Sequence, residues 1–175
     1  AETLQERREA RKQSLDERVE MAKNIARTKE NCLIWCDYNN ESSALHKAIR
    51  ESVEVKGSDT PEHKEKAMMG FASGDVKYLV TKPSICGFGM NWQNCHDMIF
   101  CGLSDSYEQF YQAIRRCYRF GQKHEVNVHV IISEKEMNVL NNIKRKQADH
   151  ERMSTEMVKV MSESAKVELF GQQRK

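Results

Sequence analysis

The sequence lacks the parts that let a chain bind and hydrolyse a nucleotide on its own. Its 175 residues contain no GxxxxGK loop followed by Ser or Thr, and no strand-like run ends in Asp-Glu to hold Mg²⁺. No apolar run approaches the length of a membrane span, and no segment has the form of a signal peptide. We therefore expect a soluble, cytoplasmic protein that has no membrane partner.

The six cysteines form no CxxC pair, and several lie inside apolar, strand-like runs. A free cysteine in such a run behaves as a small buried hydrophobe. We therefore expect reduced core residues instead of a disulfide framework or a zinc site, and we predict no metal site. The net charge is only +2, from 28 basic and 26 acidic residues, so a nucleic-acid role can be argued only from local patches.

Short apolar runs alternate with helix-like segments through the middle of the chain. Strands are predicted at Asn31–Cys36, Val53–Val55, Val76–Thr81, Asp97–Gly102 and Val126–Ile132. This alternation predicts an α/β fold, a parallel sheet covered by helices on both faces. We expect one core domain over residues 31–133, a charged N-terminal helix over residues 1–30 and a helical C-terminal extension over residues 134–175.

The segment from Tyr107 to Gln122 has the pattern of an amphipathic helix. At about 100° per residue its apolar residues share one arc, and Gln112, Arg116 and Arg119 fall on the other. Gly121 is a suitable stop, since helices often end at a left-handed glycine. Two arginines three residues apart can reach one phosphate, which a guanidinium binds through two parallel hydrogen bonds. The alternative is that these cations only complement the helix dipole and contact water.

Two polar connections follow predicted strands. They are TKPSICGFGMNWQN, after the third strand, and GLSDSYEQ, which leads into the arginine-bearing helix. Ligands bind such sheets at the carboxyl ends of the strands, so we expect both connections to converge there. Gly87 and Gly89 would let backbone amides approach a ligand closely, although an ordinary tight turn uses the same residues. Turn chemistry and phosphate contact explain Gly57, Ser58 and Thr60 of VKGSDT equally well.

Together these motifs resemble the C-terminal RecA-like lobe of superfamily 2 helicases, over roughly Asn31–Ile132. QAIRRCYRFGQ (Gln112–Gln122) resembles motif VI in its Swi/Snf-like form, and GFGMN (Gly87–Asn91) resembles motif V. CLIWCDY (Cys32–Tyr38) resembles the strand of motif IV, and KGSDT the turn after it. KPSICGFGMNWQNC is further similar to helicases of phages and bacterial mobile elements. The chain departs from the pattern at Arg115, where family members carry an acidic residue, and at LSDSYEQ, which replaces a Trp-Asn-Pro stretch.

The resemblance implies the second motor lobe of an ATP-dependent DNA helicase or translocase. Arg116 and Arg119 would be arginine fingers that reach ATP and Mg²⁺ held by an N-terminal RecA-like lobe, which this chain does not contain. The implied ATP contacts are Gln112, Gly87 and Gly89, and the implied DNA contacts are Gly57, Ser58, Thr60, Lys82 and Asn91. The alternative is a non-catalytic nucleic-acid-binding module that kept the RecA-like fold. The two hypotheses differ in whether Arg116 and Arg119 meet a nucleotide.

We predict that the purified 175-residue chain has no meaningful ATPase activity, with or without DNA, and binds no ATP or Mg²⁺ by itself. The reason is that the sequence contains neither a phosphate-cradling loop nor an Asp-Glu metal ligand. A steady-state phosphate-release assay measures this. DNA-stimulated turnover by this chain that Arg116→Ala abolishes would contradict the prediction.

Overall fold

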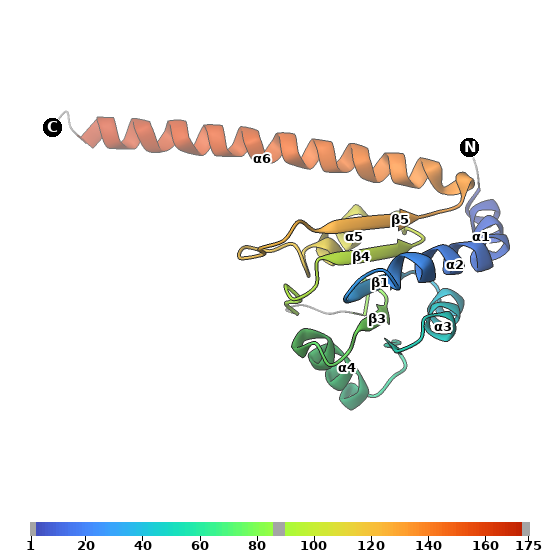
Figure 1. Cartoon of the computed structure of the whole chain (residues 1–175). Helices are drawn as coiled ribbons and strands as arrows, with labels where there is room; N and C mark the ends of the chain where they lie inside the picture. The colour runs from blue at the N-terminus through green and yellow to red at the C-terminus, as the bar shows by residue number, and fades with distance from the viewer. Residues whose placement is uncertain (1–2, 86–89, 173–175) are drawn as a thin grey trace.

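Five parallel strands form the centre of the molecule. The structure is a computed structural model that describes residues 3–85 and 90–172. The strands are β1 (Cys32–Cys36), β2 (Ser52–Glu54), β3 (Tyr78–Thr81), β4 (Asp97–Cys101) and β5 (Asn127–Ile131). They are hydrogen-bonded in the order β2-β3-β1-β4-β5, and every neighbouring pair is parallel (Figure 1). The α/β fold predicted from the alternation of apolar runs and helices is confirmed.

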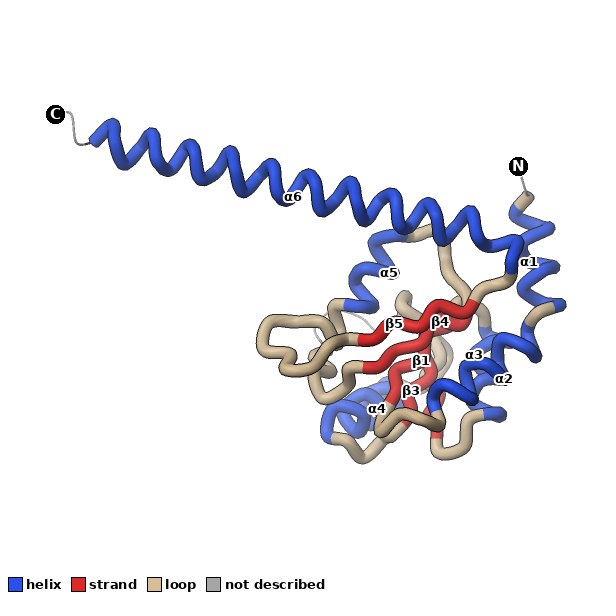
Figure 2. Tube along the Cα trace, turned by 45° about the horizontal axis from the view of Figure 1, so that its top comes forward, coloured by secondary structure: helices blue, strands red, loops and turns tan. Residues whose placement is uncertain are grey.

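Helices cover both faces of this sheet. One face carries α2 (Leu15–Ala26) and α3 (Asn39–Ala48), and the other carries α4 (Pro61–Ser73) and α5 (Tyr107–Ile114) (Figure 2). Because these helices exclude water from both faces of the sheet, the central strand β1 is buried along its whole length. Successive side chains of a strand point to opposite faces, so Leu33 and Trp35 join one core and Ile34 joins the other.

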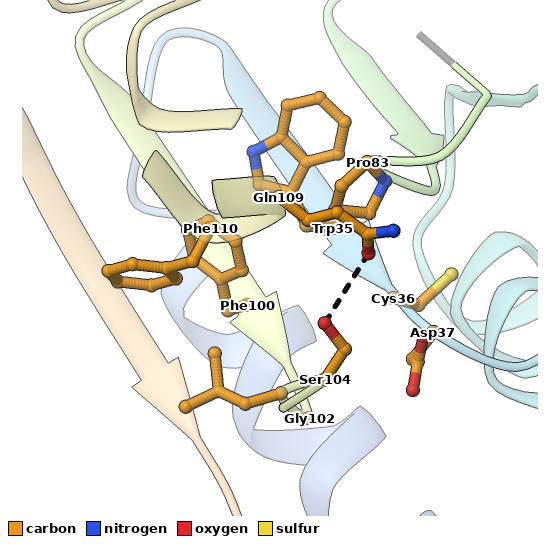
Figure 3. A pocket seen from close by; sticks show the side chains of 10 residues that line it. Trp35, Cys36, Asp37, Pro83, Phe100, Gly102, Ser104, Gln109 and Phe110 are labelled. Carbon is orange, nitrogen blue, oxygen red and sulfur yellow. Dashed lines mark hydrogen bonds between the residues drawn. The ribbon is translucent and has the colours of Figure 1, made fainter. Parts of the chain in front are cut away.

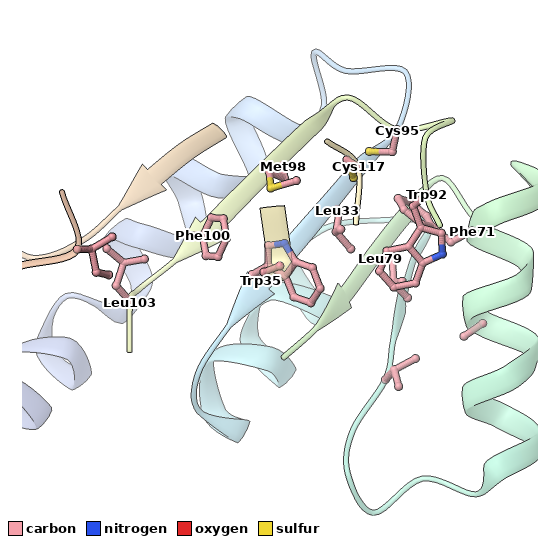
Figure 4. Close-up of a cluster of buried hydrophobic side chains, with 14 of the residues drawn as sticks. Leu33, Trp35, Phe71, Leu79, Trp92, Cys95, Met98, Phe100, Leu103 and Cys117 are labelled. Atoms are coloured by element: carbon pink, nitrogen blue, oxygen red, sulfur yellow. The ribbon is translucent and has the colours of Figure 1, made fainter. Parts of the chain in front are cut away.

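The larger core contains four of the five aromatic side chains that are buried in the described part of the chain, all but Tyr78. Figure 4 shows Trp35 and Phe100 above the sheet, with Trp92 lying against Phe71 of α4. The rings of Phe71 and Trp92 meet edge to face with centroids 5.5 Å apart, and the Trp92 indole N–H donates to the Met68 carbonyl at 3.2 Å. This core therefore anchors the loop before β4 onto α4.

Helix α4 begins as its sequence predicts. Thr60 is the N-cap, its hydroxyl accepts from the His63 amide at 3.3 Å, and Pro61 occupies the first helical position. The helix ends at a left-handed Gly74, with φ of +90°. This local chemistry needs no tertiary partner, and the sequence was sufficient to predict it.

The N-terminal segment differs from its prediction, because it is two helices instead of one. Helix α1 (Leu4–Gln13) ends at Ser14 and α2 starts at Leu15. The Ser14 hydroxyl donates back to the Ala10 carbonyl at 2.8 Å, a contact that competes with the helical ladder and bends helices. The bend lets α2 pack on the sheet while α1 turns across the carboxyl ends of the strands.

A buried ion network holds α1 in that position. Glu41 of α3 accepts from two arginines. Arg11 Nη2 lies 2.8 Å from both of its carboxylate oxygens, and Arg18 Nη2 lies 3.0 Å from Glu41 Oε1. Arg11 Nη1 also bonds Asp37 at 3.1 Å, and Arg11 Nε lies 3.4 Å from Glu136. Arg11, Arg18, Glu41 and Glu136 are all buried. Burial by itself would lower the pKa of Arg11, but Glu41 and Glu136 outweigh it and raise that pKa.

The C-terminal segment is one long helix. After the 3₁₀ turn η1 (Glu134–Glu136), α6 (Met137–Gln172) packs its first turns on the larger core through Val139 and Ile143. Further along, His150 lies against Tyr111 of α5 with ring centroids 5.4 Å apart, and the remainder of the helix projects away from the body (Figure 1). In the described part of the chain, no helix is both long enough and apolar enough to cross a bilayer.

We expect Arg11→Met to lower the free energy of unfolding by about 3–5 kcal/mol, because it leaves the buried Glu41 and Glu136 carboxylates without their main counter-ion. Urea denaturation measures this. The matched control is Arg8→Met, since Arg8 lies on the same helix but is exposed, and its effect should stay within about 0.5 kcal/mol. Equal stability of the two variants would show that the network does not hold the N-terminal helix in place.

Candidate nucleotide and nucleic-acid interface

Helix α5 is shorter than its amphipathic pattern predicts. It ends at Ile114, and the chain continues as consecutive turns from Arg115 to Gly121. The amides of Arg116 and Cys117 already bond to carbonyls three residues back. The prediction that Arg116 and Arg119 lie on a helical face is therefore wrong. Gly121 does take the predicted left-handed conformation, with φ of +94°, but it ends a loop instead of a helix. We call Arg115–Gln122 the arginine loop.

The arginine loop lies at the amino-terminal edge of the sheet, and not at the carboxyl edge where we expected it. The Trp92 amide donates to the Arg116 carbonyl at 2.9 Å, and Trp92 precedes β4. The Gln122 side chain reaches the Cys95 carbonyl at 3.3 Å, two residues before β4 begins. The end of the loop after β3 meets the arginine loop, but at the amino edge and not at the predicted carboxyl edge, because α5 and the Trp92–Cys95 segment lead back to the starts of β5 and β4.

Two glutamine amides fix the arginine loop to its neighbour. The Gln122 amide nitrogen lies within 3.0–3.3 Å of the carbonyls of Gln93, Cys95 and Cys117, and its oxygen accepts from the His124 amide. The Gln93 amide nitrogen donates to the Phe120 carbonyl at 2.5 Å. Sequence reasoning did not assign Gln93 or Gln122 a role. The available signal was the Gly121-Gln122 pair that closes the motif.

The predicted nucleotide-contacting residues differ in exposure. Gln112 on α5 and Arg119 in the arginine loop are exposed, and Arg116 is half-buried. Arg119 forms no ion pair with any acidic side chain in residues 3–85 and 90–161. Asn91 is exposed beside them, where its side-chain amide nitrogen donates to the side-chain oxygen Oε1 of Gln93 at 3.4 Å. Gly87 and Gly89 lie outside the described residues.

Two thiols meet beneath the arginine loop. Figure 4 shows the Cys95 and Cys117 side chains pointing toward each other in the core. Contact with Cys117 lowers the pKa of Cys95, whereas contact with Cys95 together with burial raises the pKa of Cys117. The five described cysteines are all buried and free, as the sequence predicts. Within the described ranges, no group of three or more metal-ligating side chains is placed to hold an ion.

At the carboxyl edge of the sheet, little space remains between the ends of β1 and β4. Between the ends of β1 and β4 there is a cavity of about 20 Å³, lined by Trp35, Asp37 and Phe110, with Ser104 hydrogen-bonded to Gln109 across it (Figure 3). That volume holds at most one water. The start of α3 carries an internal anion, since Glu41 accepts from the amides of Asp37 and Tyr38 at 3.1 Å each. The position where sheets of this kind bind phosphate is thus occupied by Glu41 and Arg11.

The remaining predicted DNA contacts lie at this carboxyl edge, away from the arginine loop. Gly57, Ser58 and Thr60 follow β2, and Lys82 follows its neighbour β3. Gly57 has open space around its Cα, and its carbonyl accepts from Lys64 at 2.6 Å. The amides of Gly57 and Ser58 donate to no acceptor among the described residues. The structure therefore brings Asn91 to the arginines but places the other four candidates elsewhere.

Comparisons with known proteins find a family match in sequence and several likenesses in structure. Residues 15–121 match the family described as the helicase conserved C-terminal domain, starting at the first residue of α2. No curated protein sequence gives a significant match. The C-terminal part of the Fun30 ATPase domain superposes with a TM-score of 0.64 at 20% identity, over 72% of this chain and 44% of that chain. This chain thus spans less than half of the Fun30 chain.

Two Dbp5 structures are similar as well. The C-terminal domain of the DEAD-box protein Dbp5 gives a TM-score of 0.66 at 15% identity, over 77% of this chain and 80% of that chain. S. cerevisiae Dbp5 bound to Gle1 and IP6 gives 0.68 at 15% identity, over 77% and 37%. These likenesses establish the fold. Because the family match also covers well over half of the sequence, this chain belongs to the helicase conserved C-terminal domain family and folds as a RecA-like lobe.

Proposed function

We propose that this chain is the second motor lobe of an ATP-dependent DNA helicase or translocase of the Swi/Snf-like branch, of the phage or mobile-element type. Helicase C-terminal domains pair with an N-terminal lobe and bind nucleic acid. The branch rests on the motif wording of QAIRRCYRFGQ and KPSICGFGMNWQNC. ATP and Mg²⁺ would be held by the N-terminal lobe, which supplies the phosphate cradle and the metal ligands absent from this sequence.

The observation that carries this proposal is the presentation of Arg119. Its side chain is exposed, while the backbone on either side is held by the Gln93, Gln122 and Trp92 hydrogen bonds. A cation whose backbone is already fixed needs little reorganisation when it meets developing negative charge. Arg116, half-buried in the same loop, would stabilise the same phosphates. Gln112 on α5 would contact the nucleotide or the opposing lobe.

The carboxyl edge supports a division of labour between two lobes. The Glu41 carboxylate already accepts hydrogen bonds from the amides of Asp37 and Tyr38, at the position where a phosphate would otherwise bind. Arg11 and Arg18 neutralise that carboxylate, so the start of α3 presents no excess positive charge that would attract a second anion. This lobe would therefore act on a nucleotide held elsewhere. That role is consistent with exposed arginines at the opposite edge.

Nucleic acid would be contacted through its backbone. The exposed amides of Gly57 and Ser58 and the ammonium group of Lys82 are suited to phosphate oxygens, which carry no sequence information. The hydroxyl of Thr60 caps α4 and would keep the first turn of this helix oriented toward the DNA backbone. Asn91 lies in the loop after β3, next to Trp92, which bonds the arginine loop. From there it would couple DNA contact to ATP, together with Gly87 and Gly89.

In the complete enzyme, we expect Arg119→Lys to reduce ATP turnover sharply while the fold and most DNA affinity survive. An arginine finger contributes on the order of 10³–10⁵ in rate in other phosphoryl-transfer enzymes. At ~1.4 kcal/mol per decade this is roughly 4–7 kcal/mol. Lysine keeps the charge but loses the planar fork, so a large part of this stabilisation should disappear. Steady-state ATPase assays with saturating DNA measure the loss.

The matched control for this substitution is Arg115→Lys. Arg115 lies in the same loop, is exposed and stacks over the Tyr111 ring at 5.9 Å, so it points back along α5. Its replacement should leave turnover within about twofold. If Arg119→Lys and Arg116→Lys both hydrolyse ATP at nearly the wild-type rate, the arginines are not fingers. A nucleic-acid-binding module without catalysis then becomes the better description.

We also expect Gln122→Ala to lower the free energy of unfolding of this chain by about 1–3 kcal/mol, because it removes the shared donor of three partly buried carbonyls. Urea denaturation measures the change. Gln109→Ala, on the exposed face of α5, is the control and should be nearly neutral. In the complete enzyme Gln122→Ala should also slow ATP turnover more than it weakens DNA binding. A variant as stable as the wild type would mean that Gln122 does not hold the loop.

A further inference from the structure

The most exposed large apolar side chain of the lobe is Phe120, which stands beside Arg119. Its ring is fully exposed, at 103% of the reference area, whereas Tyr118, the other exposed aromatic side chain in residues 3–85 and 90–161, is at 59%. Single exposed apolar residues are common on protein surfaces and usually need no explanation. Phe120 differs because it is the immediate neighbour of the proposed finger and its place in space is fixed.

The backbone around Phe120 is held on both sides. The Gln93 amide donates to the Phe120 carbonyl, the Gln122 backbone N–H donates to the Arg119 carbonyl at 3.0 Å, and Gly121 adopts a left-handed conformation that a side chain would strain. The Gln122 side chain ties the end of the loop to the segment before β4. The ring is thus presented outward by an ordered loop.

We propose that the Phe120 ring is the anchor through which this lobe docks on an apolar surface of the nucleotide-bearing N-terminal lobe. The inference rests on the proposed function. Consecutive Cα atoms are only about 3.8 Å apart, so a body that brings ATP to the Arg119 guanidinium comes close to Phe120. Aromatic residues together with arginine are the residue types enriched at the centres of protein interfaces.

The anchor would supply the orientation that the arginine needs. Removing a ring from water gives binding energy without a directional requirement, and the adjacent guanidinium then meets the phosphates in a fixed geometry. A ring that docks only when the lobes close contributes most in the closed, reactive arrangement. Loss of the ring should therefore reduce turnover without affecting the folded lobe, whose core it does not touch.

The experiment compares Phe120→Ala and Phe120→Leu in the complete enzyme. We expect ATP turnover with saturating DNA to fall roughly 10- to 100-fold in Phe120→Ala, the range of an interface hot spot, and Phe120→Leu to recover part of it. The thermal midpoint and the DNA affinity, measured by fluorescence anisotropy, should match the wild type. The control is Met69→Ala, which removes another exposed apolar side chain, at 57% of the reference area, from α4 and should change nothing.

Each other outcome overturns the anchor in a distinguishable way. If Phe120→Ala turns over ATP normally while Arg119→Lys does not, the anchor is wrong and the proposed function stands. If neither substitution slows turnover, the proposed function fails with it. A loss of DNA affinity that accounts for the whole effect would mean that the ring stacks on a base. A change of oligomeric state in light scattering would mean that it contacts a second copy.

Discussion

The pairing of Arg11 with Glu41 is the interaction on which the arrangement of this lobe depends. A buried carboxylate without a counter-ion is costly, so the N-terminal helix, the start of α3 and the turn after β5 must all stay where Glu41, Arg11 and Glu136 meet. Arg11 also donates to the Leu103 carbonyl at 3.2 Å, which ties the end of β4 to the same point. One guanidinium therefore joins four segments that are distant in the sequence.

This network gives the two edges of the sheet different roles. At the carboxyl edge, the charges at the start of α3 are paired and buried, and the cavity between the ends of β1 and β4 holds about one water. At the amino edge the charges point outward, with Arg119 exposed beside the exposed ring of Phe120. A lobe built in this way is poorly suited to hold a nucleotide in its own sheet and well suited to address one presented by another body.

At the amino edge, hydrogen bonds from neutral side-chain amides hold the segments together, whereas ion pairs do so at the carboxyl edge. The side-chain amides of Gln122 and Gln93 donate to backbone carbonyls of the arginine loop, which follows α5 without being helical. The Trp92 backbone amide donates to a third carbonyl of this loop. The loop thereby becomes a rigid continuation of the core beneath it, where Cys95 meets Cys117. A rigid support matters because a charged group acts on a reacting phosphate only from a well-defined position.

The sequence by itself determined the parallel sheet, the residues of its buried strands and the start of α4, because strand alternation and the capping of Thr60 are local properties. It also identified the arginines as a pair. Only the tertiary structure decided that α5 ends at Ile114. The helical pattern continues past that residue, but hydrogen bonds from Trp92 and Gln122 outweigh the small gain of further helical turns. The strand order decided the edge on which the arginines lie, because β4 and β5 are parallel neighbours and α5 must carry the chain from the carboxyl end of β4 back to the amino end of β5.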